Sequence, residues 1–141
     1  MKELITVALE ARKHSYSPYS HHSVGAALLY SDGTVYTGCN IENAAYSPSI
    51  CAERVAFVKA ISSQAGGHPV AIAIVGGTRD ATSLPYCTPC GVCRQVMREF
   101  CRDDFKVITS RIDSNGTILE MRQQTLSELL PDSFGPDNLS R

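Results

Sequence analysis

The sequence lacks any apolar run of about 18 residues, the length that a membrane-spanning helix requires. It also lacks a charge excess, since 13 Lys and Arg stand against 14 Asp and Glu and leave a net charge of −1. A nucleic-acid binder usually presents a basic face. The opening residues, Met1-Lys2-Glu3-Leu4, are not typical of a secretory signal. We therefore expect a cytoplasmic protein that binds neither membranes nor nucleic acid.

No linker, low-complexity tract or internal repeat divides the chain, so residues 1–141 are expected to form one domain. A domain of this size buries roughly 70% of its unfolded surface, and it needs neither disulfides nor metal merely to fold. Six cysteines are present without a secretory signal. In that context cysteines act as metal ligands or buried thiols more often than as disulfides.

Hydrophobic periodicity and turn signals predict alternating helices and strands. Asp32-Gly33 and Asn115-Gly116 are typical hairpin turns. Helices are predicted at about 3–14, 51–62, 90–101 and 125–130, and strands at 24–30, 34–39, 70–75, 105–109 and 117–121. This order predicts an α/β fold with a mixed sheet covered by helices.

The most informative motif is Cys51-Ala52-Glu53, followed by Pro89-Cys90-Gly91-Val92-Cys93. Three thiols can hold one zinc ion and leave its fourth position open for water, which is the mark of a catalytic site. A carboxylate two residues past the first ligand, followed by Pro-Cys-x-x-Cys, is the pattern of zinc-dependent base deaminases. The motif therefore predicts a zinc hydrolase that deaminates a pyrimidine.

Both cysteine motifs stand at predicted helix starts, where exposed N–H groups and a partial positive charge stabilise thiolates. Arg54 is a candidate hydrogen-bond donor to a thiolate. We expect Glu53 to move protons from the bound water to the ring and to the departing amino group, without ligating the metal.

The cysteines are compatible with two other kinds of site. The spacing of Cys87, Cys90 and Cys93 also occurs in iron–sulfur proteins. However, the bacterial cluster motif requires a fourth cysteine near position 97, which is Met97 in this sequence. A purely structural zinc would leave Glu53 without a role. We therefore expect Cys87 to be a spare thiol before the ligands. Cys39 and Cys101, at element ends, are expected to be ordinary buried thiols.

Several polar or aromatic residues outside the cysteine motifs are candidates for function. Asn40 and Glu42 alternate after a strand end, so they point the same way and could either hold a ribose hydroxyl or cap a loop. His21-His22 invites a metal interpretation, but neighbours on an extended chain face opposite sides. Phe134 would by default anchor the C-terminus.

Several further segments resemble the cytidine deaminase family, in its small homotetrameric form that acts on free nucleosides. The resemblance runs along nearly the whole chain. It includes Tyr19-Ser20, Val24-Gly25-Ala26-Ala27-Leu28-Leu29, Gly38-Cys39-Asn40-Ile41-Glu42-Asn43-Ala44, Cys51-Ala52-Glu53-Arg54, Pro89-Cys90-Gly91-Val92-Cys93-Arg94-Gln95, Glu128-Leu129-Leu130-Pro131 and Ser133-Phe134-Gly135-Pro136.

The resemblance implies a three-layer α/β/α sandwich with a mixed five-stranded sheet and one Zn²⁺ per chain. By position, it implies these roles: Cys51, Cys90 and Cys93 as zinc ligands, Glu53 as proton shuttle, Asn40 and Glu42 on the ribose 3′-hydroxyl, the backbone of Ala52 on the pyrimidine edge, and Tyr46 and Phe134 reaching a neighbouring subunit's site. It also implies a homotetramer with shared active sites.

One departure from the family concerns substrate choice. His22 stands where the family usually has a Phe beside the nucleoside, and imidazole is smaller and polar. The leading hypothesis is deamination of cytidine and 2′-deoxycytidine in pyrimidine salvage. A modified cytosine nucleoside, such as blasticidin S, is the nearest alternative. A polynucleotide deaminase and a non-catalytic zinc-binding subunit are less favoured, the latter because Glu53 is intact.

Overall fold

The computed structural model describes residues 1–139. Its elements, in chain order, are α1 (Lys2–Arg12), β1 (His22–Tyr30), β2 (Val35–Cys39), α2 (Ala52–Ser62), β3 (Pro69–Thr78), α3 (Gly91–Phe100), β4 (Lys106–Ile112), β5 (Ile118–Thr125), α4 (Leu126–Leu129) and a 3-10 helix, η1 (Pro136–Leu139). Within this described part, no helix has the length and apolar character needed to cross a bilayer.

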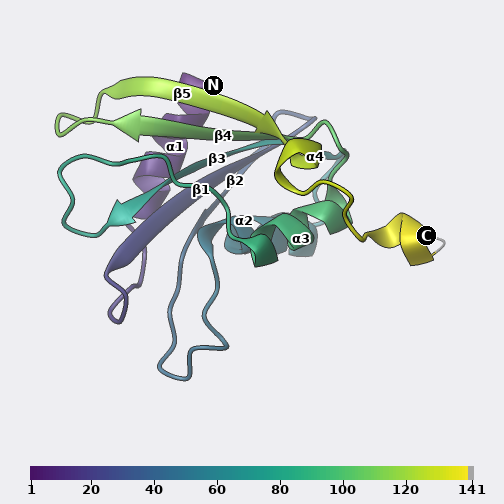
Figure 1. The fold of residues 1–141 in the computed structure, drawn as a ribbon, viewed down its shortest axis with the longest axis horizontal. Coiled ribbons are helices and arrows are strands. Elements are labelled where there is room, and N and C mark those ends of the chain that lie inside the picture. Colours follow the sequence, from purple (N-terminus) through teal and green to yellow (C-terminus); the bar gives the residue numbers. More distant parts are fainter. Residues whose placement is uncertain (140–141) are drawn as a thin grey trace.

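The strands form one mixed sheet, as predicted. Over residues 1–139 the strand order is β2-β1-β3-β4-β5 (Figure 1). β1 pairs antiparallel with β2 and β3, and β4 pairs antiparallel with β5. β3 and β4 run parallel, and α3 supplies the crossover that a parallel connection needs.

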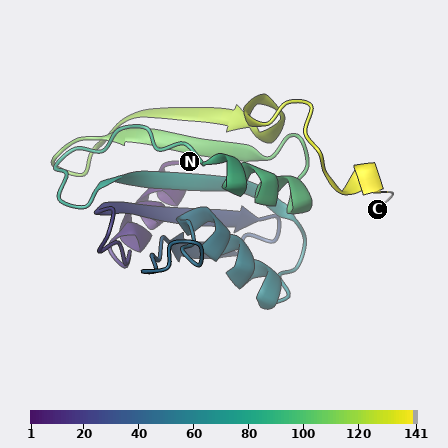
Figure 2. The same ribbon diagram turned by 60° about the horizontal axis from the view of Figure 1, so that its bottom comes forward.

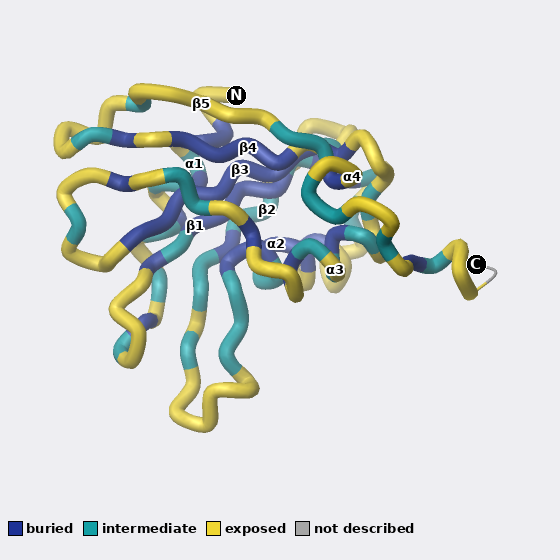
Figure 3. Tube along the Cα trace, viewed as in Figure 1, coloured by how far each residue is buried: buried dark blue, intermediate teal, exposed yellow. Residues whose placement is uncertain are grey.

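Helices cover both faces of the sheet, which confirms the three-layer α/β/α architecture (Figures 1 and 2). Successive side chains of a strand point to opposite faces. One core packs α2 and α3 against Ala26, Leu28, Ile72 and Ile74. The other packs α1 against Ala27, Ala71, Ala73 and Ile108. Burial concentrates along β1, β3 and β4, whereas most of the edge strand β5 is exposed (Figure 3).

Element boundaries differ from the prediction mainly where strands end. β3 continues through Gly76 and Gly77 to Thr78, because the antiparallel pairing with β1 extends to His22. β5 continues to Thr125, whose hydroxyl accepts a hydrogen bond from the Glu128 backbone N–H and caps α4. The 3-10 helix η1 was not predicted.

Two glycines let helices lie directly against the sheet. A Cβ at Gly25 would stand 2.0 Å from the Ala8 carbonyl oxygen of α1. A Cβ at Gly38 would stand 2.2 Å from the Ala52 carbonyl oxygen and 2.6 Å from the Ala56 nitrogen, both in α2. The first turn of α2 carries the Cys-Ala-Glu motif, so the absence of a side chain at Gly38 sets the position of that motif relative to the sheet.

We predict that Gly38→Ala destabilises the protein by about 1–3 kcal/mol, because the added methyl group would overlap helix backbone that cannot move independently. Gly66→Ala is the matched control, since its Cβ would meet only Asp32 Oδ2 at 3.6 Å. Urea unfolding at fixed protein and zinc concentrations measures both. Equal midpoints for the two variants would contradict the close-packing argument.

Candidate metal centre and substrate cleft

Three thiols converge where α2 and α3 begin. Cys51 is the N-cap residue of α2, Cys90 is the N-cap residue of α3, and Cys93 lies in the first turn of α3. Their sulfur atoms all lie within 4.8 Å of one another, and Cys51 Sγ and Cys90 Sγ are 3.9 Å apart. A tetrahedral zinc ion with bonds of about 2.3 Å separates its thiolates by about 3.8 Å. The donor set therefore fits zinc.

The surroundings of these thiols favour the ionised form of Cys51. A hydrogen bond from Cys93, followed by those from Arg54 and Cys90, lowers the pKa of Cys51 to about 5. Nη2 of Arg54 lies 3.6 Å from Cys51 Sγ. Arg54 is thus in the position expected of a donor to a thiolate, and its charge offsets part of the negative charge of the cluster.

Glu53 follows in the first turn of α2 and is only 4% exposed. Burial, with a smaller contribution from the Cys51 thiolate, raises the pKa of Glu53 to about 7. A nearby divalent cation acts in the opposite direction, because it favours the carboxylate. A carboxyl group whose two protonation states are close in free energy near neutral pH can both accept and donate a proton.

A cleft of about 330 Å³ joins this cluster to the candidate substrate-binding positions. Sequence analysis had singled out most of its lining, namely His22, Asn40, Glu42, Cys51, Ala52, Glu53 and Cys90. Cys87 also lines it, together with three residues that sequence analysis did not select, Ser20, Val24 and Thr88. Residues separated by up to about half the chain therefore share one surface.

Asn40 holds the cleft wall through its own side chain. Its Oδ1 accepts hydrogen bonds from the Val24 N–H at 2.8 Å and the Ser15 hydroxyl at 2.5 Å. Its Nδ2 donates to the His22 carbonyl at 2.7 Å. The loop-capping interpretation therefore describes real contacts of Asn40. An amide nitrogen carries two N–H groups, so these contacts leave one for a ligand.

Glu42 is fixed at the rim of the cleft by the turn that precedes β1. Its Oε1 accepts hydrogen bonds from the backbone N–H groups of Tyr19 and Ser20, at 3.0 and 3.1 Å. The Ser20 hydroxyl donates to its Oε2 and is the main reason that the pKa of Glu42 lies below its usual value. Ser20 was missed as a site residue, although it belongs to the turn signal Pro18-Tyr19-Ser20 and to the Tyr19-Ser20 segment that resembles the family.

Tyr46 and Phe134 lie away from the cleft of their own chain. Tyr46 is 74% exposed on the projecting loop between β2 and α2, with its ring edge-on to Tyr19. Phe134 is 59% exposed on the C-terminal segment. Both segments stand out from the body of the molecule (Figures 1 and 3).

Burial of the Phe134 side chain does not account for how the C-terminal segment is held, since this residue is largely exposed. Side chains of α3 hold this segment instead. Gln95 donates to the Phe134 carbonyl at 3.0 Å, and Arg98 donates to the Ser133 hydroxyl at 2.9 Å. Arg98 also forms an ion pair with Asp137 at 2.5 Å.

The remaining cysteines stand apart from the thiol cluster. Cys87 is half-buried, and burial raises its pKa to about 12, so it stays a neutral thiol near neutral pH. Among residues 1–139, the group of three thiols that could hold a metal does not include Cys87. Cys39 and Cys101 are half-buried, and desolvation raises the pKa of each.

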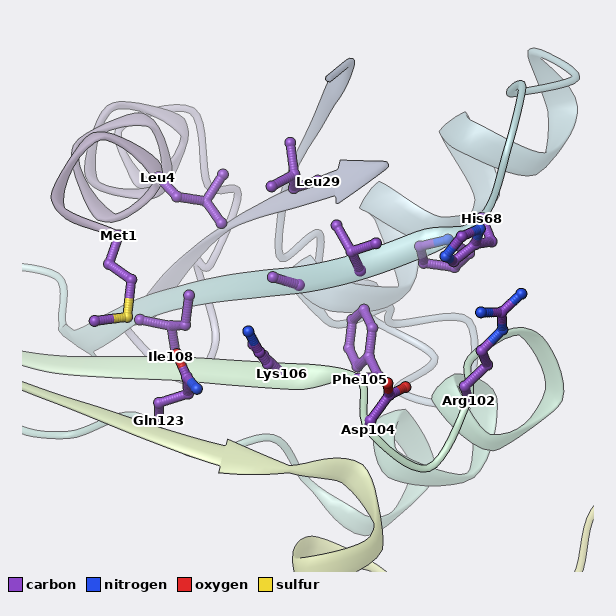
Figure 4. Close-up of a pocket in the computed structure, with 13 residues that line it drawn as sticks. Met1, Leu4, Leu29, His68, Arg102, Asp104, Phe105, Lys106, Ile108 and Gln123 are labelled. Atoms are coloured by element: carbon purple, nitrogen blue, oxygen red, sulfur yellow. The ribbon is translucent and has the colours of Figure 1, made fainter. Parts of the chain in front are cut away.

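A larger cavity, of about 380 Å³, lies elsewhere (Figure 4). It is bounded by α1 and the starts of β3 and β4, with Leu4, Leu29 and Phe105 among its apolar lining and His68 and Arg102 at one end. It contains no thiol and shares no residue with the cleft. Size alone therefore does not mark the reactive site.

Residues 1–109 match the family model of the cytidine and deoxycytidylate deaminase zinc-binding region. The chain belongs to the cytidine deaminase family. The metal for the thiol cluster is accordingly zinc, and the protein is a hydrolase of the deaminase class. Both conclusions confirm the predictions drawn from the cysteine motifs.

Similar proteins support the same assignment over nearly the full chain. The chain is 42% identical to a cytidine deaminase of Sporosarcina psychrophila over 140 residues, which cover 99% of this chain and 95% of that protein. The crystal structure of a cytidine deaminase from Burkholderia pseudomallei superposes with a TM-score of 0.79 at 40% identity, covering 94% of this chain and 98% of the other. A more distant relative is a blasticidin-S deaminase of Bacillus cereus, 29% identical over 92% of this chain and 88% of that protein.

We predict that Cys87→Ser keeps about one zinc per chain and near-normal activity, because Cys87 stands outside the thiol cluster. Cys93→Ser is the comparison, and it should lose most of its zinc because one of three thiolate ligands is removed. Elemental analysis after gel filtration measures the zinc content. Loss of zinc from Cys87→Ser would instead make Cys87 a ligand.

Proposed function

We propose that this chain, as a one-domain cytoplasmic enzyme of pyrimidine salvage, hydrolyses cytidine and 2′-deoxycytidine to uridine and 2′-deoxyuridine and releases ammonia. The observation that carries the proposal is the single cleft whose lining includes Cys51 and Cys90 of the thiol cluster, Glu53, Asn40 and Glu42. The thiols and Glu53 suit attack of water on a ring carbon, and Asn40 and Glu42 suit binding of a sugar. Free thiols as metal ligands also suit a reducing compartment.

In the proposed reaction Cys51, Cys90 and Cys93 hold the zinc ion, which when bound supplies a water molecule acidified to near neutral pH. Glu53 accepts a proton from that water and delivers it to N3 of the cytosine ring, so that C4 becomes electrophilic. After the water oxygen adds at C4, Glu53 accepts the second proton of that oxygen and passes it to the amino group. The C4–N bond then breaks, ammonia leaves, and C4 becomes a carbonyl carbon. One water is consumed and one ammonia is produced for each uridine.

The position of Glu53 suits this double role. It is buried, so water does not compete for its protons. Burial raises the pKa of its carboxyl group whereas a bound cation lowers it, and these opposing effects suit transfer in both directions. It is separated from Cys51 by one residue in the first turn of α2, so the helix that positions the ligand also positions the proton carrier.

Asn40 and Glu42 are proposed to hold the ribose 3′-hydroxyl. Glu42 is preset for this role, because hydrogen bonds from Tyr19 and Ser20 fix its carboxylate before any ligand binds. The backbone of Ala52, which lines the same cleft beside Glu53, is proposed to contact the pyrimidine edge.

We also propose a homotetramer in which Tyr46 and Phe134 complete a neighbouring subunit's site. Their exposure supports this, since large aromatic rings at 74% and 59% exposure on projecting segments suit an interface with another chain. The contacts of α3 with the C-terminal segment hold Phe134 in an outward position.

A second candidate substrate is a modified cytosine nucleoside. His22 is the observation that favours it, because this polar ring lines the cleft where the family usually presents an apolar Phe. The blasticidin-S deaminase of Bacillus cereus is a relative that acts on such a compound. Asn40 and Glu42 instead favour a substrate with an ordinary ribose.

We predict that the zinc-replete wild-type protein converts cytidine to uridine and that Glu53→Gln keeps its zinc but loses about 10²–10⁴ in kcat, the usual contribution of a general acid–base group. Ultraviolet absorbance during incubation with cytidine measures turnover, and elemental analysis measures zinc. A wild-type protein that binds zinc but does not convert cytidine would contradict the proposed substrate. Zinc loss from Glu53→Gln would show that Glu53 acts as a ligand.

We predict that His22→Phe lowers the KM for cytidine severalfold, because an aromatic hydrocarbon ring loses less hydration than imidazole when it packs on the base. His14→Phe, an exposed position outside the cleft, is the control. Steady-state kinetics on cytidine compare the two. A higher KM for His22→Phe would make His22 a specific contact and would favour the modified nucleoside.

A further inference from the structure

Arg12, the last residue of α1, spans the ends of two strands. Its Nε donates to the Ser23 carbonyl of β1 at 2.9 Å. Its Nη2 lies 3.1 Å from the Gly77 carbonyl and 2.8 Å from the Thr78 carbonyl, both in β3. Ser23 and Gly77 are register partners in the antiparallel β1–β3 pair. One guanidinium therefore holds both strands where β1 begins and β3 ends.

The close approach of α1 to the sheet makes this reach short. A Cβ at Gly25 would lie 2.4 Å from the Arg12 backbone nitrogen, so the last turn of α1 is seated directly on β1. Arg12 itself is half-buried. Its side chain is consequently fixed at both ends, by the helix backbone and by the three carbonyl groups.

The opposite face of the same strand ends forms part of the substrate cleft. Because side chains alternate along a strand, His22 and Val24 face the other way from Ser23, and both line the cleft. A Cβ at Gly76, one residue before Gly77, would stand 2.6 Å from Cys87 Sγ, which also lines the cleft. Arg12 thus lies behind the wall against which the nucleoside is expected to bind.

The start of β1 is held along both of its edges. On the edge next to β2, Asn40 accepts from the Val24 N–H and donates to the His22 carbonyl. The Ser23 carbonyl points to the opposite edge, next to β3, and accepts from Arg12. The backbone at 22–24 is therefore restrained by hydrogen bonds to two side chains from different elements.

We propose that Arg12 is a positioning residue for the substrate cleft. Its guanidinium holds the ends of β1 and β3 so that His22 and Val24 keep fixed places beside the nucleoside, although Arg12 is absent from the lining of the cleft and from the thiol cluster. This inference rests on the proposed deamination of a nucleoside in that cleft.

The guanidinium group suits this role better than an ammonium group. Its donors are held in a rigid planar fork, so Nε and Nη2 can serve two strands at once in fixed directions. The ammonium group of a lysine is a single, flexible point of donation. Replacement by lysine should therefore keep the charge but loosen the coupling between β1 and β3.

The experiment compares the zinc-loaded wild type with Arg12→Lys, Arg12→Ala and Lys13→Ala. Lys13→Ala is the matched control, because it removes the adjacent cation, whose Nζ contacts exposed Glu10 and not the sheet. We expect the KM for cytidine to rise about tenfold in Arg12→Ala and less in Arg12→Lys, with kcat and zinc content close to wild type. Added methylguanidinium should lower the KM of Arg12→Ala again.

Two results would overturn the proposal. One is a KM in Arg12→Ala equal to that in Lys13→Ala. The other is a joint loss of kcat, zinc and thermal stability without rescue by methylguanidinium, which would mean that Arg12 only supports the fold. If Arg12→Ala fails to fold, Arg12→Lys is judged by the same KM comparison.

Amide hydrogen exchange separates this inference from the proposed function, since it needs no turnover. Faster exchange at 22–24 and 76–78 in Arg12→Lys than in Lys13→Ala would support the role of Arg12 even if cytidine were not the substrate. Equal exchange in the two variants would overturn it. Absence of wild-type turnover would count against the proposed substrate alone.

Discussion

The meeting of two helix N-termini at one point is the constraint on which the rest of the molecule depends. The charges of three thiolates and one divalent cation sum to −1, and this net charge lies in a partly buried position. The N-terminal ends of α2 and α3 supply partial positive charge, and Arg54 adds a full one beside Cys51. The sheet order, the crossover through α3 and the close seating of α2 on Gly38 bring those two helix ends together.

The helices that carry the chemistry could be predicted from the sequence because their signals are local. Cys51 and Cys90 stand at the starts of apolar periodic segments, and Pro89 marks the second start. The extent of β3 could not be predicted in this way. Gly76 and Gly77 look like a strand terminator, and the pairing with His22–Val24, distant in sequence, decides that the strand continues. Strand ends depend on partners that local propensity does not describe.

In the candidate site, too, residues in local motifs could be predicted and residues placed by distant pairing could not. The ligands and Glu53 belong to short motifs, whereas Ser20 and Val24 enter the cleft only because the sheet folds them there. The two possible roles of Asn40 could not be separated by spacing, since its side chain has enough donors and acceptors for both. Arg12 left no signal beyond a basic residue at a helix end, because its three acceptors are carbonyl groups, which every residue possesses.

The helix α3 carries metal-binding thiols at its start and, through Gln95 and Arg98, holds the C-terminal segment further along. For anyone preparing this protein, an affinity tag or fusion partner at the C-terminus would adjoin the segment that Gln95 and Arg98 hold against the helix of Cys90 and Cys93. One at the N-terminus would adjoin α1, which carries none of the thiols.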